Sequence, residues 1–254
     1  MIKIIIIGTG NVGTHLCRAI ESNSHSSGLL LIGYYNRAQT ELSGINTNLI
    51  PDIHSLPECD LILLAVPDDS IEKVSQEIRS SPSIVAHTSG SVAMKVLQNH
   101  KNHGVFYMPQ SFSKSRKPNF EEITICLESS TSAVNKVLEI VAVTLSRKRE
   151  QINSQQRKKL HLAAVYMNNF VNHCYSKAGE IMKEAYMDAN LLDALMRETL
   201  EKAIDLSPQK AQTGPAIRND LKTIEKHLKM LEKEDREMYR SITTSIQKTH
   251  GNKL

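Results

Sequence analysis

Cysteine is scarce in this sequence of 254 residues, and the four cysteines present lie far apart, at positions 17, 59, 126 and 174. None belongs to a Cys-x-x-Cys pair, and none has a histidine at the spacing of zinc ligands. We therefore expect neither a disulfide framework nor a bound metal, and we expect the protein to reside in a reducing compartment.

Long apolar segments are also lacking. No stretch approaches the roughly 20 residues that a helix needs to cross a bilayer, and the apolar run at residues 1–7 is too short for the core of a signal peptide. These absences predict a soluble, cytoplasmic protein with no membrane partner.

A strong charge bias is absent as well. Lys and Arg number 14 against 14 acidic residues up to residue 150, and 17 against 13 beyond it, so the net charge of +4 belongs to the C-terminal part. The basic residues there gather in segments such as 157–159 and 222–233, where interspersed Glu is typical of a solvated helix face. We expect no nucleic-acid partner.

The N-terminal segment carries the most informative pattern. The apolar run Ile2–Ile7 leads into a glycine turn, and the turn leads into a helix-like segment at 14–20. A continuous β-branched run is typical of a parallel strand that is buried on both faces. The turn consists of Gly8, Thr9, Gly10, Asn11, Val12 and Gly13.

This strand, turn and helix predict a dinucleotide site formed by the six residues of the turn. The first glycine permits a tight turn, the second lets the pyrophosphate approach the backbone, and the third lets helix and strand pack closely. The phosphates are expected at the helix N-terminus. The string alone is a weak signal, and the strand and helix around it supply the required context.

The second apolar run, Leu29–Tyr35, indicates which dinucleotide binds. It ends at Asn36 and Arg37, where an NAD enzyme places an acidic residue against the ribose hydroxyls. No acid is present here, and Asn36 can hydrogen-bond the ribose while Arg37 pairs with a 2′-phosphate. The pattern favours NADP as the cofactor. The alternative is that Arg37 is a solvated loop residue.

Strands and helices alternate through residues 1–149. This alternation predicts an α/β domain with a doubly wound, mostly parallel Rossmann sheet. Strands are expected at 2–7, 29–35, 59–66, 83–86, 104–107 and 123–127, with a weak one at 49–50. Helices are expected at 14–20, 38–42, 70–79, 91–100 and 131–145.

Beyond residue 149 the periodicity becomes helical. A long amphipathic helix is expected at 154–185, further helices at 191–206 and 221–248, and a loop at 207–220. We therefore predict two domains, a nucleotide-binding domain at 1–149 and an all-helical domain at 150–254 for substrate binding and dimerisation. Ligands are expected at the carboxyl ends of the strands.

Two predicted strands end in candidate site residues. Val66 and Pro67 are expected to line the cofactor site, whereas the two acids after them more often cap a helix. The next strand ends in His-Thr-Ser-Gly-Ser, a donor-rich segment suited to a carboxylate or carbonyl oxygen. We assign His87 and Ser89 to catalysis and Ser91 to substrate binding. The alternative is a capping serine beside a core histidine.

Further candidates lie on the strand after that and on the long helix. Gln110, near Tyr107, is a candidate substrate contact, with packing as the alternative. His161, Asn168 and Asn172 form a polar strip on one side of the otherwise apolar helix, and Asn169 lies close beside it. Such a strip is expected to face a wet cleft, where His161 and Asn169 act in catalysis and Asn168 contacts substrate. The alternatives are a structural role for His161, and Lys158 or Lys159 as the proton donor.

The loop at 211–220 is the densest polar segment of the helical half. It holds Thr213 and Arg218, both candidate substrate contacts. The alternative is that Arg218 pairs with Asp220 and only holds the loop against the next helix.

Several of these motifs together resemble one uncharacterised family. They are the glycine turn with Asn11, the His-Thr-Ser-Gly-Ser segment, Leu160–Val165, Asn169–His173, and Gln212–Ala216 followed by Arg218 and Asp220. That family pairs a Rossmann-like NADP-binding domain with the helical domain of unknown function 2520. The resemblance covers essentially the whole chain, although Met108-Pro109 departs from the expected order, in which Pro precedes the aliphatic residue.

The resemblance implies a fold like that of pyrroline-5-carboxylate reductase, prephenate dehydrogenase and 6-phosphogluconate dehydrogenase. Family members carry the provisional name of NADP oxidoreductases. We therefore expect an NADP-dependent oxidoreductase that exchanges a hydride with the carbonyl or imine carbon of a small polar metabolite, and a homodimer formed through the apolar face of the helix at 154–185. The alternative is a non-catalytic NADP-binding sensor or interaction module.

Overall fold

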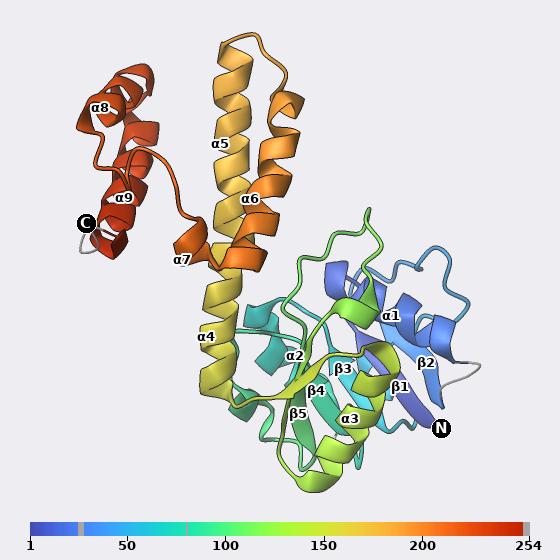
Figure 1. Ribbon diagram of the computed structural model, residues 1–254. Helices are drawn as coiled ribbons and strands as arrows, with labels where there is room; N and C mark the ends of the chain where they lie inside the picture. The colour runs from blue at the N-terminus through green and yellow to red at the C-terminus, as the bar shows by residue number, and fades with distance from the viewer. Residues whose placement is uncertain (25–27, 80, 251–254) are drawn as a thin grey trace. The chain divides into compact units, whose positions relative to one another are not determined.

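The structure is a computed structural model that describes residues 1–24, 28–79 and 81–250 (Figure 1). The chain divides into two compact units, Met1–Cys174 and Tyr175–Leu254. The first unit therefore extends beyond the change from strands to helices that the sequence places near residue 150. Within the described residues, no helix is both long enough and apolar enough to span a membrane.

The first unit is built on a mostly parallel sheet, as predicted. In the described residues it has seven strands in the order β2-β1-β3-β4-β5-β6-β7. Neighbouring strands are parallel except β5 and β6, which are antiparallel. The strands are β1 (Ile2–Ile7), β2 (Leu29–Tyr35), β3 (Leu61–Leu64), β4 (Ile84–His87), β5 (His103–Tyr107), β6 (Ile125–Ser129) and β7 (Arg149–Gln151).

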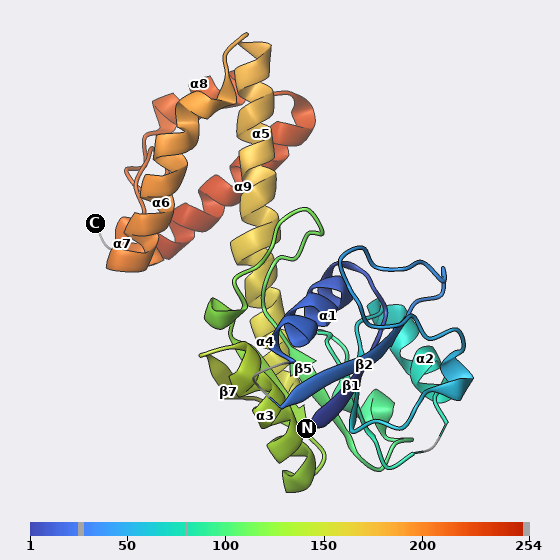
Figure 2. The same cartoon turned by 90° about the vertical axis from the view of Figure 1, so that its right-hand side faces the viewer.

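Alternate side chains of β1 enter two cores, one on each face of the sheet. Ile4 and Ile6 pack in the core that contains α1 (Asn11–Asn23) and α3 (Ser132–Leu145). Ile5 and Ile7 pack in the core that contains α2 (Ile71–Glu77), on the opposite face (Figure 2). Burial on both faces is the physical reason for the continuous isoleucine run.

Several short elements differ from the prediction. No helix forms at 38–42, because Gln39 adopts a left-handed φ of 49° and the Asn36 side chain bonds the backbone of Thr40, which competes with helical hydrogen bonds. The weak strand at 49–50 is a single bridge between Tyr34 and Leu49. The helix expected at 91–100 is a 3-10 turn at Met94–Leu97. Other 3-10 turns lie at Ile53–Ser55, Asp68–Ser70 and Phe120–Glu122.

The long helix expected at 154–185 is present, with an irregular centre. It consists of α4 (Ser154–Ala164), a π-helical segment (Val165–Phe170) and α5 (Val171–Glu184). Asn153 and Gln156 form a capping box at its start, in which each side chain bonds the other residue's backbone N–H. Single π turns inside α-helices occur frequently at functional sites.

The second unit is helical throughout its described residues. After α5 it contains a 3-10 turn (Ala189–Leu192), α6 (Asp193–Leu206), α7 (Pro208–Ala211), α8 (Leu221–Met230) and α9 (Lys233–His250). The helix expected at 221–248 is broken, because Leu231 has extended backbone angles and its carbonyl accepts a bond from the Arg236 side chain. The loop expected at 207–220 contains the short α7.

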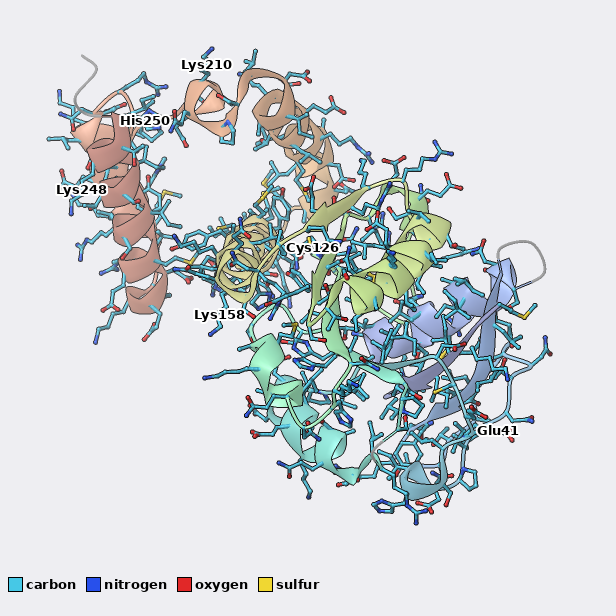
Figure 3. All side chains as sticks on the ribbon, turned by 90° about the horizontal axis from the view of Figure 1, so that it is seen from below. Glu41, Cys126, Lys158, Lys210, Lys248 and His250 are labelled. Carbon is cyan, nitrogen blue, oxygen red and sulfur yellow. The ribbon has the colours of Figure 1, made fainter. Side chains whose placement is uncertain are left out.

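All four cysteines lie in the described part of the chain and are free thiols. Cys17, Cys59 and Cys126 are buried and Cys174 is exposed; Figure 3 labels Cys126. Burial raises the pKa of Cys17 to about 12 and that of Cys126 to about 11. These two side chains therefore behave as small apolar groups of the core.

Candidate active site

The three glycines of the turn after β1 have different surroundings. Gly8 has a φ of +95°, and a Cβ there would lie 2.5 Å from the Ala65 carbonyl oxygen. A Cβ on Gly13 would lie 1.8 Å from the Gly8 carbonyl oxygen. A Cβ on Gly10 would meet nothing within 4 Å. Gly8 and Gly13 thus serve the turn and the packing, whereas Gly10 leaves open space over the backbone.

The N-terminus of α1 faces that open space without a cap of its own. Gly10 is the N-cap residue, and within residues 1–24, 28–79 and 81–250 no side chain caps the first N–H groups of the helix. Free N–H groups and the helix dipole both favour a phosphate at this position. The residues present therefore fit the pyrophosphate of a dinucleotide.

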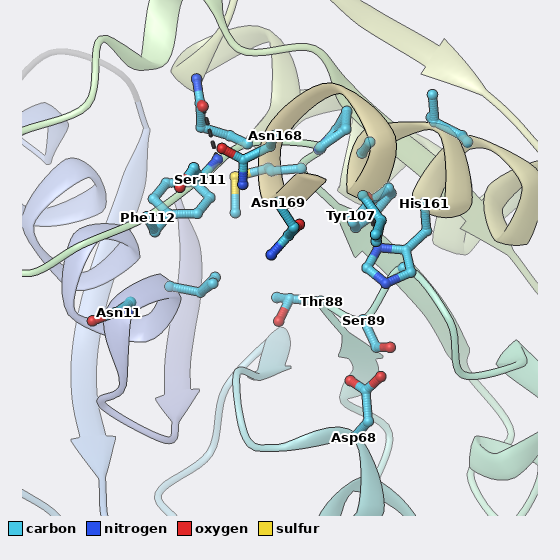
Figure 4. Close-up of a pocket in the computed structure, with 18 of the residues that line it drawn as sticks. Asn11, Asp68, Thr88, Ser89, Tyr107, Ser111, Phe112, His161, Asn168 and Asn169 are labelled. Atoms are coloured by element: carbon cyan, nitrogen blue, oxygen red, sulfur yellow. Dashed lines mark hydrogen bonds between the residues drawn. The ribbon is translucent and has the colours of Figure 1, made fainter. Parts of the chain in front are cut away.

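A pocket of about 800 Å³ opens at the carboxyl ends of the strands, between the glycine turn and α4. In Figure 4, Asn11 and His161 lie on opposite sides of it, with Thr88, Ser89 and Asn169 between them. The lining combines apolar side chains with amides, hydroxyls, one carboxylate and one imidazole. Ten of the predicted residues line it: Gly10, Asn11, Val12, Val66, Pro67, Ser89, Gln110, His161, Asn168 and Asn169.

Both asparagines of the π-helical segment line the pocket. Consecutive residues of a regular α-helix point in directions about 100° apart, so one of two neighbours commonly turns away from a site. The wider turn at Val165–Phe170 reduces that angle. The sequence periodicity alone placed Asn169 beside the polar strip and gave no sign of this irregular turn.

Asn36 and Arg37 do not line this pocket. The Asn36 side chain is buried and both ends of its amide are bonded to the Thr40 backbone, at 2.7 and 3.0 Å. These bonds shape the loop after β2, and the bond from this amide to a ribose stays a prediction. Arg37 is exposed at the start of that loop.

His87 lies outside the pocket lining and is fully buried. Its Nδ1 accepts a hydrogen bond of 3.2 Å from the backbone N–H of Ser89. Burial, and to a lesser degree the nearby charge of Arg157, lower the pKa of His87 to about 4. The imidazole is therefore neutral at pH 7 and supports the loop after β4, which is the core-histidine alternative rather than direct catalysis.

The serines of that loop organise it from within. The Ser89 hydroxyl accepts bonds of 3.1 Å from the backbone N–H groups of Ser91 and Val92. The Ser91 hydroxyl donates to the carboxylate of Asp68, which follows β3 and lines the pocket. Ser89 lines the pocket. Ser91 does not line it and is connected to it through its hydrogen bond to Asp68.

Tyr107 and His161 meet above the loop after β4. The Tyr107 hydroxyl lies 3.3 Å from His161 Nδ1, and the rings are edge to face. Gly90 makes this contact possible, because a Cβ there would lie 2.7 Å from His161 Nδ1 and 2.7 Å from Tyr107 Cζ. Burial raises the pKa of Tyr107 to about 12, so its hydroxyl keeps its proton at pH 7.

Arg157 anchors α4 one turn before His161. Its side chain is fully buried, pairs with Glu128 of β6 and donates to the Val92 carbonyl. Ser154 also donates to Glu128. The expectation that 157–159 is a solvated face is therefore wrong for Arg157, although Lys158 is exposed (Figure 3). In the sequence, the one signal for a special role of Arg157 was its position four residues before His161, which places both on the same face of the helix.

Thr213 and Arg218 belong to the second unit, in the segment between α7 and α8. Asp220 caps α8 by accepting a bond of 3.1 Å from the Thr223 backbone. The Thr223 bonds lower the pKa of Asp220, and the charge of Arg218 contributes less. Asp220 therefore has a structural role in this loop, while the roles of Thr213 and Arg218 stay predictions.

Two families of known domains match this chain. Residues 1–110 match a Rossmann-like domain, and residues 123–246 match the domain of unknown function DUF2520. Among curated proteins, no sequence matches the chain.

Solved structures extend the comparison over the whole chain. A Bacteroides fragilis protein, provisionally named an NADP oxidoreductase, is 32% identical with a TM-score of 0.86, covering 97% of this chain and 98% of its own. Plasmodium falciparum pyrroline carboxylate reductase, solved with NADP, is 14% identical with a TM-score of 0.64, covering 98% and 97%. An imine reductase from Myxococcus stipitatus, in complex with NADP+, is 13% identical with a TM-score of 0.63, covering 96% and 91%. The last two show likeness of fold alone.

Proposed function

The chain belongs to the family that joins a Rossmann-like domain to the DUF2520 domain, and from that premise we propose that it is an NADP-dependent oxidoreductase. In this proposal a hydride passes between the nicotinamide and the carbonyl or imine carbon of a small polar metabolite. One observation carries it: a single pocket is bordered by the glycine turn on one side and by His161 on the other. Hydride transfer requires cofactor, substrate and polarising group to meet in such a space.

The glycine turn and the loop after β2 would hold the cofactor. Gly10 admits the pyrophosphate to the backbone and the first turn of α1 binds it. Arg37, presented by the Asn36 loop, pairs with the 2′-phosphate, and Val66 and Pro67 border the cofactor along the pocket. When bound, NADPH supplies the hydride, and the residues of the chain orient it.

His161 and the two asparagines would act on the substrate. His161 donates a hydrogen bond to the carbonyl oxygen or imine nitrogen, which polarises the double bond as the hydride arrives. Asn169 supports the same atom, while Asn168, Gln110 and the Ser89 hydroxyl fix the orientation of the molecule. The apolar remainder of the lining keeps water away from the reacting carbon.

An imine is the substrate type to examine first. Two proteins of similar fold are named for pyrroline carboxylate and imine reduction, which supports including cyclic imines beside keto acids and hydroxy acids in a screen. This support is an analogy of fold, and the choice among substrates rests on measured turnover.

The test is NADPH consumption by the full-length protein with small imines, keto acids and hydroxy acids. We expect one class to give turnover, and His161→Gln to lower the rate by at least about a hundredfold with the affinity for NADPH unchanged. His173→Gln, an exposed histidine on α5, is the matched control. NADP binding without turnover of any class would instead support the sensor alternative.

We also propose a homodimer. The π-helical segment exposes Met167 and Phe170 by 79% and 50%, and α6 exposes Leu200 and Ile204 by 60% and 72%. Apolar surface on this scale is typical of association sites, and most soluble oligomers are symmetric homodimers. Light scattering at micromolar concentration should give twice the mass of one chain. A monomer under those conditions would contradict the proposal.

Thr213 and Arg218 complete the proposed set as substrate contacts. Arg218→Ala should raise the KM for the substrate and leave the unfolding transition unchanged. A destabilised variant with normal KM would instead place Arg218 among the residues that hold the loop.

A further inference from the structure

We infer that Tyr107 is the positioning residue of His161, and that it fixes the neutral imidazole with its proton on Nε2. This inference rests on the proposed function for its role in catalysis, but the arrangement itself is a property of the folded chain. Three elements meet to build it: Tyr107 at the end of β5, His161 on α4 and Gly90 in the loop after β4.

The contact has the geometry of a hydrogen bond. Tyr107 Oη and His161 Nδ1 are 3.3 Å apart, and the rings are inclined by 75° with centroids 6.1 Å apart. Tyr107 is only 6% exposed, and the residue borders the pocket. In Figure 4 one ring nitrogen of His161 lies beside Tyr107 and the other on the side of Ser89.

The direction of this bond follows from which of the two groups has another hydrogen-bond partner. Within the described residues, His161 is the one hydrogen-bond partner of the Tyr107 hydroxyl. If the hydroxyl accepted a hydrogen bond from Nδ1, its own proton would have no acceptor among the described residues, which costs free energy. Burial also keeps the phenol protonated. The hydroxyl therefore donates to Nδ1, and the proton of the neutral ring resides on Nε2.

This arrangement decides what the pocket offers a ligand. With Nδ1 occupied by the tyrosine, Nε2 carries a proton in the neutral ring as well as in the protonated ring. A hydrogen-bond donor then faces the pocket in both forms of the ring, which suits the polarisation of a carbonyl or imine. In the other tautomer Nε2 would be an acceptor and would repel the same ligand atom.

Gly90 is the spacer on which the pair depends. A Cβ at this position would approach both His161 Nδ1 and Tyr107 Cζ to 2.7 Å, closer than van der Waals contact allows. Any larger residue at 90 must push the two rings apart. Gly179, on α5, has nothing within 4 Å of such a Cβ and provides a matched alanine control.

The test is the tautomer of His161, measured by nuclear magnetic resonance on the full chain with ¹⁵N-labelled histidine. The His161 signals are assigned by their loss in His161→Gln. At a pH where the ring is neutral, we expect protonated Nε2 and unprotonated Nδ1. In Tyr107→Phe both nitrogen shifts should move toward the average of the two tautomers, and Gly90→Ala should give the same change. Tyr166→Phe, an exposed tyrosine on the same helix, and Gly179→Ala should leave them unchanged.

Two results would overturn the inference: a protonated Nδ1 in the wild-type protein, or unchanged nitrogen shifts in a folded Tyr107→Phe variant. Neither depends on turnover, so failure of the inference is distinguishable from failure of the proposed reaction. Where turnover is found, Tyr107→Phe should lower kcat by about tenfold, the loss expected for one orienting hydrogen bond. It should have no further effect in the His161→Gln background, because Tyr107 acts through His161.

Discussion

Arg157 of α4 forms an ion pair with Glu128 of β6, and the arginine side chain has no exposed surface while that of the glutamate is 14% exposed. Ser154 donates to the same carboxylate, and Arg157 also donates to the Val92 carbonyl. The helix that carries His161 is therefore fastened to the sheet and to the loop after β4 through one buried charge cluster.

Removing one member of this cluster should cost more than removing a neighbouring charge. Arg157→Ala leaves the Glu128 carboxylate without its partner, so we expect the free energy of unfolding to fall by about 3–5 kcal/mol. Lys158→Ala, at an exposed position, should change it by less than about 0.5 kcal/mol. Urea unfolding of both variants measures the difference, and equal stabilities would mean that the buried pair contributes little.

The glycine turn allows folding and cofactor binding to be separated. Gly13→Ala should destabilise the protein by about 3 kcal/mol or more, because the new methyl group meets the Gly8 carbonyl. Gly10→Ala has room and an ordinary φ of −68°, so its cost should stay within about 1 kcal/mol. It should nevertheless lose most NADP affinity, since the methyl group fills the approach of the pyrophosphate. Full NADP binding by a folded Gly10→Ala variant, measured by fluorescence titration, would place the phosphates elsewhere.

Cofactor preference should depend on Arg37. Ligand at a hundred times its dissociation constant stabilises a protein by about 2.7 kcal/mol, so NADP should raise the melting temperature more than NAD at equal concentration. Arg37→Ala should remove most of that difference and leave the response to NAD unchanged. Equal shifts with both cofactors in the wild-type protein would contradict the assignment.

The buried His87 predicts a particular pH dependence of stability. Its pKa is lowered in the fold from 6.5 to about 4 by burial, so between these values the unfolded chain binds a proton that the folded protein does not. Stability should therefore fall as the pH decreases from about 6.5 to about 4, by about 3 kcal/mol from this residue. Urea unfolding at several pH values gives the free energy of unfolding as a function of pH. This free energy should fall less steeply with decreasing pH in His87→Gln than in the wild type. The control His173→Gln should keep the pH dependence of the wild type.

The parts of the fold that follow from local patterns could be predicted from the sequence. The isoleucine run, the glycine turn and the helix after it are contiguous, and the cap Thr131 marks the start of α3 by its bond to the Val134 backbone. Hydrophobic periodicity also located the long helix. Each of these signals lies within a few residues of the element that it predicts.

The parts that depend on distant contacts could not be predicted. Arg157 is buried because its side chain pairs with Glu128, which lies 29 residues earlier in the chain, on β6. His87 is a core residue because of the layers that cover β4, and nothing in its own segment indicates that burial. The π-helical turn at Val165–Phe170 leaves no mark on the apolar spacing, although it contains Asn168 and Asn169, which both line the pocket.

The four thiols differ in exposure, and this difference allows one of them to be labelled selectively. Cys17, Cys59 and Cys126 are buried, and burial raises the pKa of each, so the reactive thiolate form is disfavoured at neutral pH. Cys174 is exposed on α5, at the last residue of the first compact unit. A maleimide dye should therefore attach at that position alone in a single native chain, and the proposed homodimer should protect it, because Cys174 lies four residues after Phe170 on the same helix face. One fluorophore at the last residue of the first unit then reports on its own surroundings while cofactor is added, with no engineered substitution.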